Sequence, residues 1–281
     1  MKIAYGTYAM PTVPLEEAFP MLAGIGYDGV EVCISDKHHG ATPDQMDADR
    51  RANLRGLLEQ QGLGVPALFL LGSVYTPDDQ AHRANLERVR LCAQLARDLG
   101  MREPPVLAMG FGGKRDDWDA IRPRMVQLLG DYADLAEQED FILAGEAHCG
   151  AAVYNSERIV SLLSEVNDPR VRLHFDIVHL FLAGEPIEQA VATLVPWTAH
   201  THITDAIRHD DGSFQLVLLG DGDLDAVAYM RAMKQAGWTD FITLEVSTMV
   251  WAKEDYDVRA AARKSYDALA AAFEAAGVER P

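Results

Sequence analysis

The feature that most constrains the fold of this chain is an alternation of short β-rich runs with longer segments of helical periodicity. The pattern recurs eight times without a linker, a low-complexity tract or a break in composition. Strands are predicted at residues 2–8, 29–34, 65–71, 106–109, 141–146, 171–177, 197–203 and 241–246, with an extra strand at 215–219. Helices are predicted at residues 15–24, 43–61, 78–99, 116–138, 156–166, 186–194, 224–236 and 258–276.

Eight β-then-α units predict an α/β protein with a single (β/α)8 TIM barrel domain over residues 1–281, closed by the C-terminal helix. The length of 281 residues suits such a barrel, which typically takes about 250 residues. A doubly wound open sheet is the alternative. That fold usually carries a glycine fingerprint in its first turn, and residues 5–10 contain none.

The charge balance limits the partners that we expect. The chain has 43 acidic and 25 basic residues, which gives a formal net charge of -18. Such a chain repels phosphate backbones and anionic lipid surfaces. The sequence therefore predicts neither a nucleic-acid partner nor a membrane partner, and a small molecule is the expected ligand.

The cysteine content and the N-terminal residues bear on location. Cys33, Cys92 and Cys149 show no close spacing, which argues against a disulfide framework or a thiolate zinc site and fits a reducing compartment. The first residues lack the apolar core of a signal peptide, and no apolar stretch approaches the length of a membrane span. We expect a cytoplasmic protein, and the sequence leaves homo-oligomerisation open.

Acids and histidines stand at the ends of four consecutive predicted strands. In a (β/α)8 barrel the active site forms at the C-terminal ends of the strands. These positions carry Glu146, Asp176, His202 and Glu245. Each of them alone is more simply a strand-end residue bonded to loop amides, and Asp176 alone is more simply a helix N-cap. Their common height on neighbouring strands favours a shared site.

Three carboxylates and an imidazole at one point would repel one another and raise each other's pKa unless a cation were present. We therefore predict one divalent metal ion bound by Glu146, Asp176, His202 and Glu245. The oxygen-rich set favours Mn²⁺, with Mg²⁺, Co²⁺ or Zn²⁺ as alternatives.

Short motifs along the whole chain resemble, in their order and spacing, those of the xylose-isomerase-like sugar isomerase and epimerase superfamily. They lie at residues 27–32, 146–148, 176–179, 200–205, 219–225 and 243–245. The resemblance implies a (β/α)8 barrel whose metal is held by the four residues named above. It also implies that Glu146 and Glu245 act as catalytic acid and base on opposite faces of the substrate.

Further residues are expected to bind the substrate. The resemblance implies that His179, expected in a loop beyond the strand, and Arg208 hold substrate oxygens. We expect His148 to orient a substrate hydroxyl or to carry a proton, and Glu31 to support a histidine or to bind a substrate hydroxyl. Histidines satisfied by loop contacts are the alternative at 148 and 179.

The expected activity is that of an enzyme, a metal-dependent isomerase or epimerase of a ketose, keto sugar or related polyol-carbonyl. It would abstract a proton next to a carbonyl and form a metal-stabilised enediolate. Residues 146–152 lack the second acidic residue of typical ketose 3-epimerases, so a lyase or dehydratase remains the alternative. Its substrate would be a keto sugar, an inosose or a dehydroshikimate-like compound. A non-catalytic sugar-binding or partner subunit is the alternative of another class.

Overall fold

Eight parallel strands close into a barrel in the computed structural model, which describes residues 1–280. The strands follow the order β1-β10-β7-β6-β5-β4-β3-β2 around the barrel. Their bounds are β1 (Lys2–Gly6), β2 (Gly29–Ile34), β3 (Leu68–Ser73), β4 (Val106–Gly110), β5 (Ile142–Glu146), β6 (Val171–Asp176), β7 (Thr198–Ile203) and β10 (Phe241–Leu244). The predicted (β/α)8 barrel is confirmed.

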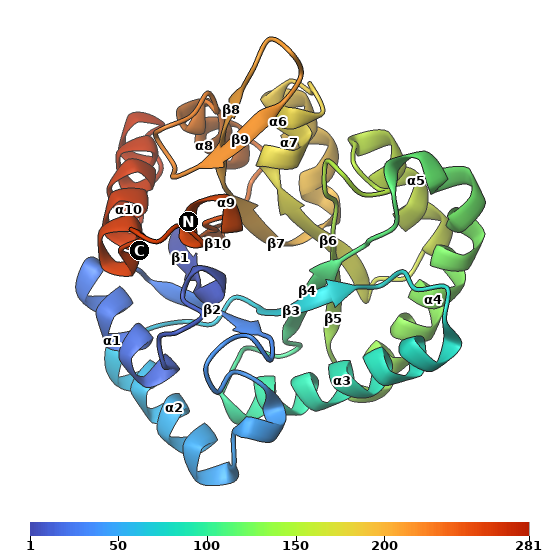
Figure 1. Ribbon diagram of the computed structural model, residues 1–281, viewed down its shortest axis with the longest axis horizontal. Coiled ribbons are helices and arrows are strands. Elements are labelled where there is room, and N and C mark those ends of the chain that lie inside the picture. Colours follow the sequence, from blue (N-terminus) through green and yellow to red (C-terminus); the bar gives the residue numbers. More distant parts are fainter. Residues whose placement is uncertain (281) are drawn as a thin grey trace.

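Helices surround the barrel as an outer ring (Figure 1). The long ones are α1 (Leu15–Ile25), α2 (Ala48–Gln61), α3 (Asp79–Asp98), α4 (Trp118–Glu139), α5 (Ser156–Val166), α7 (Ile187–Leu194), α8 (Ala226–Gln235) and α10 (Val258–Ala275). Shorter turns are η1 (Thr7–Ala9), η2 (Pro43–Gln45), η3 (Arg115–Asp117), α6 (Ile177–Leu182), η4 (Val195–Trp197) and α9 (Thr248–Trp251). Within residues 1–280 we find no helix whose length and apolar content would let it cross a membrane.

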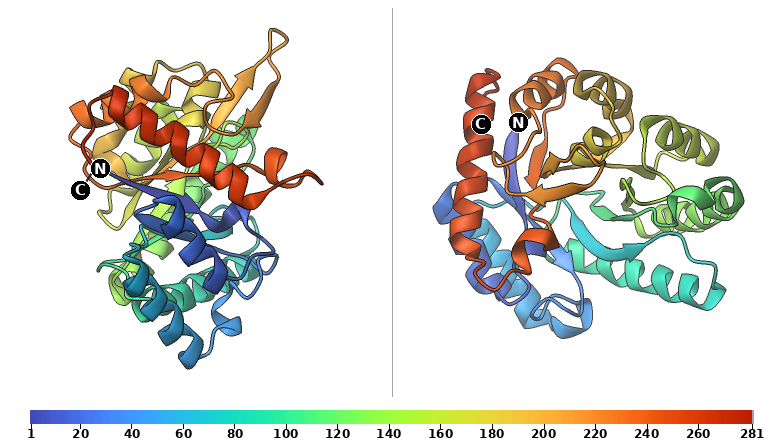
Figure 2. Two further views of the ribbon diagram at one scale, coloured as in Figure 1. Left: turned by 90° about the vertical axis from the view of Figure 1, so that its left-hand side faces the viewer. Right: turned by 45° about the horizontal axis from the view of Figure 1, so that its top comes forward.

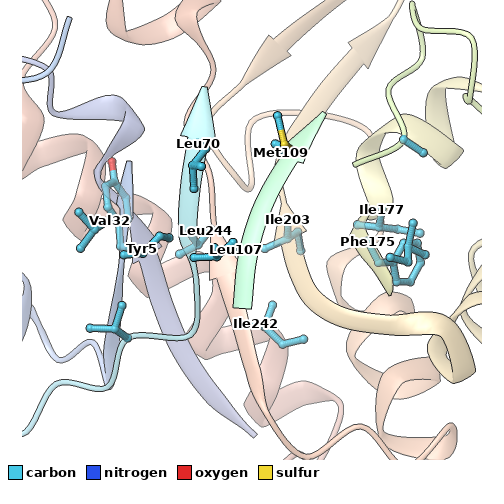
Figure 3. Close-up of a cluster of buried hydrophobic side chains, with 14 of the residues drawn as sticks. Tyr5, Val32, Leu70, Leu107, Met109, Phe175, Ile177, Ile203, Ile242 and Leu244 are labelled. Carbon is cyan, nitrogen blue, oxygen red and sulfur yellow. The ribbon is translucent and has the colours of Figure 1, made fainter. Parts of the chain in front are cut away.

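Alternate side chains of each strand face opposite sides of the barrel wall. The outward set packs against the helices as a continuous apolar layer, part of which is shown in Figure 3. In β2, for example, Val30, Val32 and Ile34 belong to this layer, whereas Glu31 and Cys33 face the interior. An acid or a histidine at an inward position therefore lies inside the barrel.

Two segments after the strands differ from the prediction. β6 ends at Asp176 and helix α6 begins at once, so His179 lies on a helix and the predicted loop position was wrong. The extra strand predicted at 215–219 is one arm of a hairpin, formed by β8 (Asp205–Arg208) and β9 (Phe214–Val217). Figure 2 shows this hairpin standing away from the barrel.

A buried aspartate anchors the base of the hairpin. The carboxylate of Asp205 accepts hydrogen bonds from the backbone N–H groups of Ala206, Gly220, Gly222 and Leu224, at 2.8 to 3.0 Å. A Cβ atom at position 222 would lie 2.3 Å from Asp205 Oδ1, so only glycine fits there. The motif at residues 219–225 thus closes the loop that follows β7.

Candidate active site and metal centre

The four predicted metal ligands come from neighbouring strands at one height. Glu146 and Asp176 are the last residues of β5 and β6, and Asp176 is paired in register with His202 of β7. His202 is level with Thr243 of β10, two residues before Glu245. Asp176 and His202 are fully buried, and Glu146 is 8% exposed. The barrel therefore brings all four to its C-terminal end.

Their polar atoms surround a common space. Single donor atoms of Glu146, Asp176 and His202 lie within 4.8 Å of one another. His202 Nδ1 is 3.8 Å from Glu146 Oε1 and 3.8 Å from Glu245 Oε2. Ligands about 2.2 Å from a six-coordinate ion are about 3.1 to 4.4 Å apart, so this spacing suits a divalent cation.

Two buried atoms of this group lack a hydrogen-bond partner among the described residues, namely His202 Nδ1 and Asp176 Oδ2. The other oxygen of Asp176, Oδ1, accepts the Val178 N–H at 3.0 Å and caps α6. Both interpretations of Asp176, as an N-cap and as a ligand, are thus compatible, because each uses a different oxygen. Unpaired buried acceptors beside three carboxylates fit a bound cation.

Without a metal, burial and mutual repulsion raise the pKa values of the three carboxyl groups of this centre. Burial, together with the charge of Glu245, raises the pKa of Glu146 well above its usual range. Burial also raises the pKa of Asp176 to about 6 and that of Glu245 to about 7. A divalent cation would replace these protons and remove the repulsion, so the residues present fit the predicted metal.

Glu31 supports His202 from the opposite side of the imidazole ring. Glu31 Oε2 lies 2.8 Å from His202 Nε2 and 2.5 Å from His200 Nε2. Burial opposes its ionisation, but the two histidines lower the pKa of Glu31 to about 2. Despite the same burial, Glu31 and the other carboxylates raise the pKa of His202 to about 10. This contact occupies Nε2 and turns Nδ1 toward the carboxylates.

Of the two roles expected for Glu31, only support of a histidine matches its contacts. Its side chain has no exposed surface and lies behind His202, so its contacts match the first of the two alternatives, support of a histidine. Glycine at position 6 leaves room for Glu31, because a Cβ atom added at Gly6 would lie 2.9 Å from Glu31 Oε1.

The two histidines predicted to bind substrate meet beside the centre. The rings of His148, which follows β5, and His179, on α6, have centroids 4.0 Å apart. His179 Nε2 lies 3.7 Å from Asp176 Oδ2, and His148 is exposed. Arg208 lies on the hairpin, where its exposed guanidinium stacks 4.1 Å above the ring of Phe181. It contacts α6 and none of the four ligand residues.

Aromatic side chains line another side of the centre. The Tyr8 ring meets those of Phe69 and Trp251 edge-on, at centroid distances of 6.1 and 5.5 Å. Phe69 lies 5.4 Å from the His202 ring. His38 is buried and bonds the carbonyl of Tyr8 at 3.0 Å. These rings form an apolar wall next to the carboxylates.

The comparison with protein families agrees with this geometry. The model of the xylose isomerase-like TIM barrel family matches residues 19–274. The chain belongs to this family. The predicted resemblance to the xylose-isomerase-like superfamily is thereby confirmed.

Curated relatives of this xylose isomerase-like barrel are epimerases. Fructoselysine 3-epimerase of Escherichia coli O157:H7 is 23% identical over 262 residues, which cover 89% of this chain and 91% of the relative. L-ribulose-5-phosphate 3-epimerase UlaE of Salmonella heidelberg (strain SL476) is 21% identical over 258 residues, covering 90% and 88%. These relatives support the prediction of an enzyme over that of a non-catalytic subunit.

Solved structures share the fold along their whole length. The IOLI protein with a bound zinc atom superposes with a TM-score of 0.78 at 19% identity and covers 99% of this chain and 98% of that one. The probable 3-DHS dehydratase AsbF from Bacillus anthracis gives a TM-score of 0.79 at 15% identity, covering 96% and 99%. The bound zinc shows that a barrel of this fold can hold a metal.

Sequence reasoning missed two inward-facing histidines of this family member. His174 and His200 lie two residues before Asp176 and His202, and with Glu31 and His202 they form a second group of potential metal donors. Glu31 Oε2 bonds both His200 and His202, whereas Glu31 Oε1 and both ring nitrogens of His174 have no hydrogen-bond partner among the described residues. The period of two along β6 and β7 is the signal that could have placed both histidines inside the barrel.

Proposed function

We propose that this protein is a divalent-metal-dependent epimerase or isomerase acting on a ketose, keto sugar or related polyol-carbonyl. The observation that carries the proposal is the position of two glutamates with raised pKa, Glu146 and Glu245, each 3.8 Å from the free nitrogen of His202. The epimerase activity of the curated relatives supports the same reaction class.

In this proposal the metal ligands are Glu146, Asp176, His202 and Glu245. Once bound, the ion supplies Lewis-acid polarisation of the substrate carbonyl. The excess of oxygen donors supports Mn²⁺ as the resident ion. Glu31 keeps the His202 ring oriented through the bond to Nε2.

The two glutamates are the proposed acid and base. Glu146 ends β5 and Glu245 follows β10, the outer two of four consecutive strands, and Asp176 and His202 lie between them. A substrate placed over the middle two strands would meet one carboxyl group on each side. One glutamate removes the proton next to the carbonyl and the other returns a proton to the opposite face, which inverts that carbon.

The surrounding residues position the substrate. His148 and His179 offer ring nitrogens to its hydroxyl groups from one side, while Tyr8, Phe69 and Trp251 exclude water on the other. Arg208 on the exposed hairpin would contact the distal end of a longer substrate.

One observation keeps elimination as a second candidate. Residues 147–152 contain no carboxylate, and the polar groups there are His148 and Cys149. A histidine near the substrate can protonate a leaving hydroxyl group, which would turn proton abstraction into dehydration. The likeness in fold to the probable 3-DHS dehydratase is consistent with that course.

The test is solvent deuterium exchange by the Mn²⁺-loaded protein on a panel of ketoses, phosphorylated ketoses, keto sugars and inososes. Incorporation of one deuterium with inversion supports the epimerase, and loss of water supports the lyase. If no member of the panel exchanges a proton and the protein contains no stoichiometric metal, the proposal is wrong.

A further inference from the structure

A second group of potential metal donors lies beside the proposed centre and contains sulfur. One ring nitrogen each of His148 and His179 and the sulfur of Cys149 all lie within 4.8 Å of one another. His148 and Cys149, the second and third residues after β5, lie beside the buried histidine of α6, and Cys149 Sγ is 4.0 Å from His148 Nδ1. Cys149 is partly exposed and His148 is exposed, so ions in solution can reach the group.

The backbone of the loop holds the two neighbouring donors in place. The His148 N–H donates to the carbonyl of Val153 at 3.1 Å, and the Ala151 N–H donates to the carbonyl of His148 at 2.8 Å. The Gly150 N–H donates to His148 Nδ1 at 3.1 Å. This tight turn directs the imidazole and the thiol toward α6.

His179 gives an independent sign of a missing partner. Its side chain is 3% exposed, and its Nδ1 atom has no hydrogen-bond partner among residues 1–280. A buried ring nitrogen without a partner is costly. A ligand at this place would satisfy it.

We propose that His148, Cys149 and His179 bind a second cation of the soft, zinc-like class, such as Zn²⁺ or Cd²⁺. A thiolate with two imidazoles is the donor set that zinc prefers and that Mn²⁺ and Mg²⁺ do not. Tetrahedral zinc with bonds of about 2.0 Å to nitrogen and 2.3 Å to sulfur needs donors about 3.3 to 3.6 Å apart. The three donor atoms, now within 4.8 Å of one another, reach this spacing by small side-chain rotations, and the fourth position is open to solvent.

Occupation of this site would inhibit the enzyme. His148 and His179 are the groups assigned above to substrate hydroxyls, so an ion held by both competes with the substrate. This consequence rests on the proposed function, whereas binding of the ion does not. Inhibition by excess zinc, with Mn²⁺ activating, is therefore the expected pattern.

Titration of the Mn²⁺-loaded full chain with Cd²⁺ tests the site. The readouts are the ultraviolet charge-transfer absorption of a cadmium–thiolate bond and the number of ions retained after dialysis. Wild type is expected to bind one Cd²⁺ with the thiolate band, and Cys149→Ala is expected to lose both. Cys92→Ala, which removes a thiol buried in α3, is the matched control and should keep them.

Absence of the band in wild type, or its persistence in Cys149→Ala, would overturn the proposal. His148→Asn provides a second check, since it keeps all three thiols and is expected to weaken Cd²⁺ binding. Unchanged binding in that variant would also contradict the site. If the band behaves as expected but no substrate turns over, the proposed function fails and the metal site stands.

Discussion

The two halves of the barrel wall differ sharply in what they present to the interior. Strands β1 to β4 contribute mostly small or apolar inward side chains, including Ala4, Cys33, Phe69 and Ala108. Strands β5, β6, β7 and β10 contribute the acids and histidines that form the centre. Apolar packing therefore accounts for the inward side chains of the first half, and the second half carries the carboxylates that we propose bind a divalent cation.

Glu31 is the exception that links the halves. It is the charged inward residue of β2, and it reaches across the barrel to two histidines of β7. The comparison predicts that changes in the second half alter chemistry and metal binding, that Glu31 acts on the metal indirectly, and that apolar changes in the first half alter stability but not metal affinity.

The largest effect is expected from Glu245→Gln in the second half. The amide keeps an oxygen donor for the metal but cannot exchange a proton with carbon, so kcat should fall about 10²- to 10⁴-fold. Steady-state kinetics together with metal analysis of the same sample measures both. Full activity with metal retained would remove Glu245 from the acid–base pair.

Next in size is the pH dependence of stability in the metal-free protein. Burial raises the pKa of Glu245 from 4.5 to about 7 and that of Asp176 from 3.8 to about 6, so the folded state binds more protons than the unfolded state. The contribution of these two carboxyl groups to the free energy of unfolding therefore falls as pH rises from 4.5 to 7, whereas the buried histidines with lowered pKa, such as His174 and His179, contribute in the opposite direction. For Glu245 the fall amounts to about 3 kcal/mol, at 1.36 kcal/mol per pH unit.

Urea denaturation of EDTA-treated protein across this pH range measures the slope of the free energy of unfolding against pH. Relative to wild type, Glu245→Gln should lose the downward contribution of this carboxyl group, because the amide does not titrate. The exposed Glu188→Gln is the matched control and should leave the slope unchanged. The same pH slope in wild type and in Glu245→Gln would contradict the protonated centre.

Glu31→Gln tests the contact through which the first half of the barrel acts on the metal site of the second half. Loss of the charged contact to Nε2 should weaken metal binding about 10- to 100-fold, as is usual for groups that orient a metal-bound histidine. Competition with a chelator measures the affinity, and Glu188→Gln serves again as the control. An unchanged affinity would reduce Glu31 to a packing role.

The smallest effect is expected in the apolar half. Phe69→Leu removes part of the ring that faces His202 and should cost about 1 kcal/mol of stability. Metal affinity should stay within about threefold of wild type. A larger loss of affinity in this variant would break the division between the two halves.

The sequence predicted the barrel and the meeting of the four ligands for clear physical reasons. The alternation of strand and helix patterns is local, and the C-terminal ends of parallel strands in a closed barrel must meet. The family match confirms the predicted superfamily. Local patterns also indicated the loop motif at 219–225, although its anchor, Asp205, emerged only from the backbone contacts.

Other features of the site could not be predicted from the sequence, because they depend on contacts across the barrel. The role of Glu31 needed the distance from β2 to β7, which no local pattern gives. His179 was placed in a loop because nothing in residues 177–182 marks a helix start except Asp176 itself, which we had assigned to the metal. The pairing of His148 with His179 joins residues 31 positions apart on different elements.

Anomalous diffraction from crystals of the Mn²⁺-loaded protein tests the central claim most directly. The account predicts one manganese peak within about 2.0 to 2.6 Å of an oxygen or nitrogen atom of Glu146, Asp176, His202 and Glu245, with His202 bound through Nδ1. Glu31 should remain bonded to His202 Nε2. A peak among Glu31, His174 and His200, or no peak in the barrel, would contradict the account.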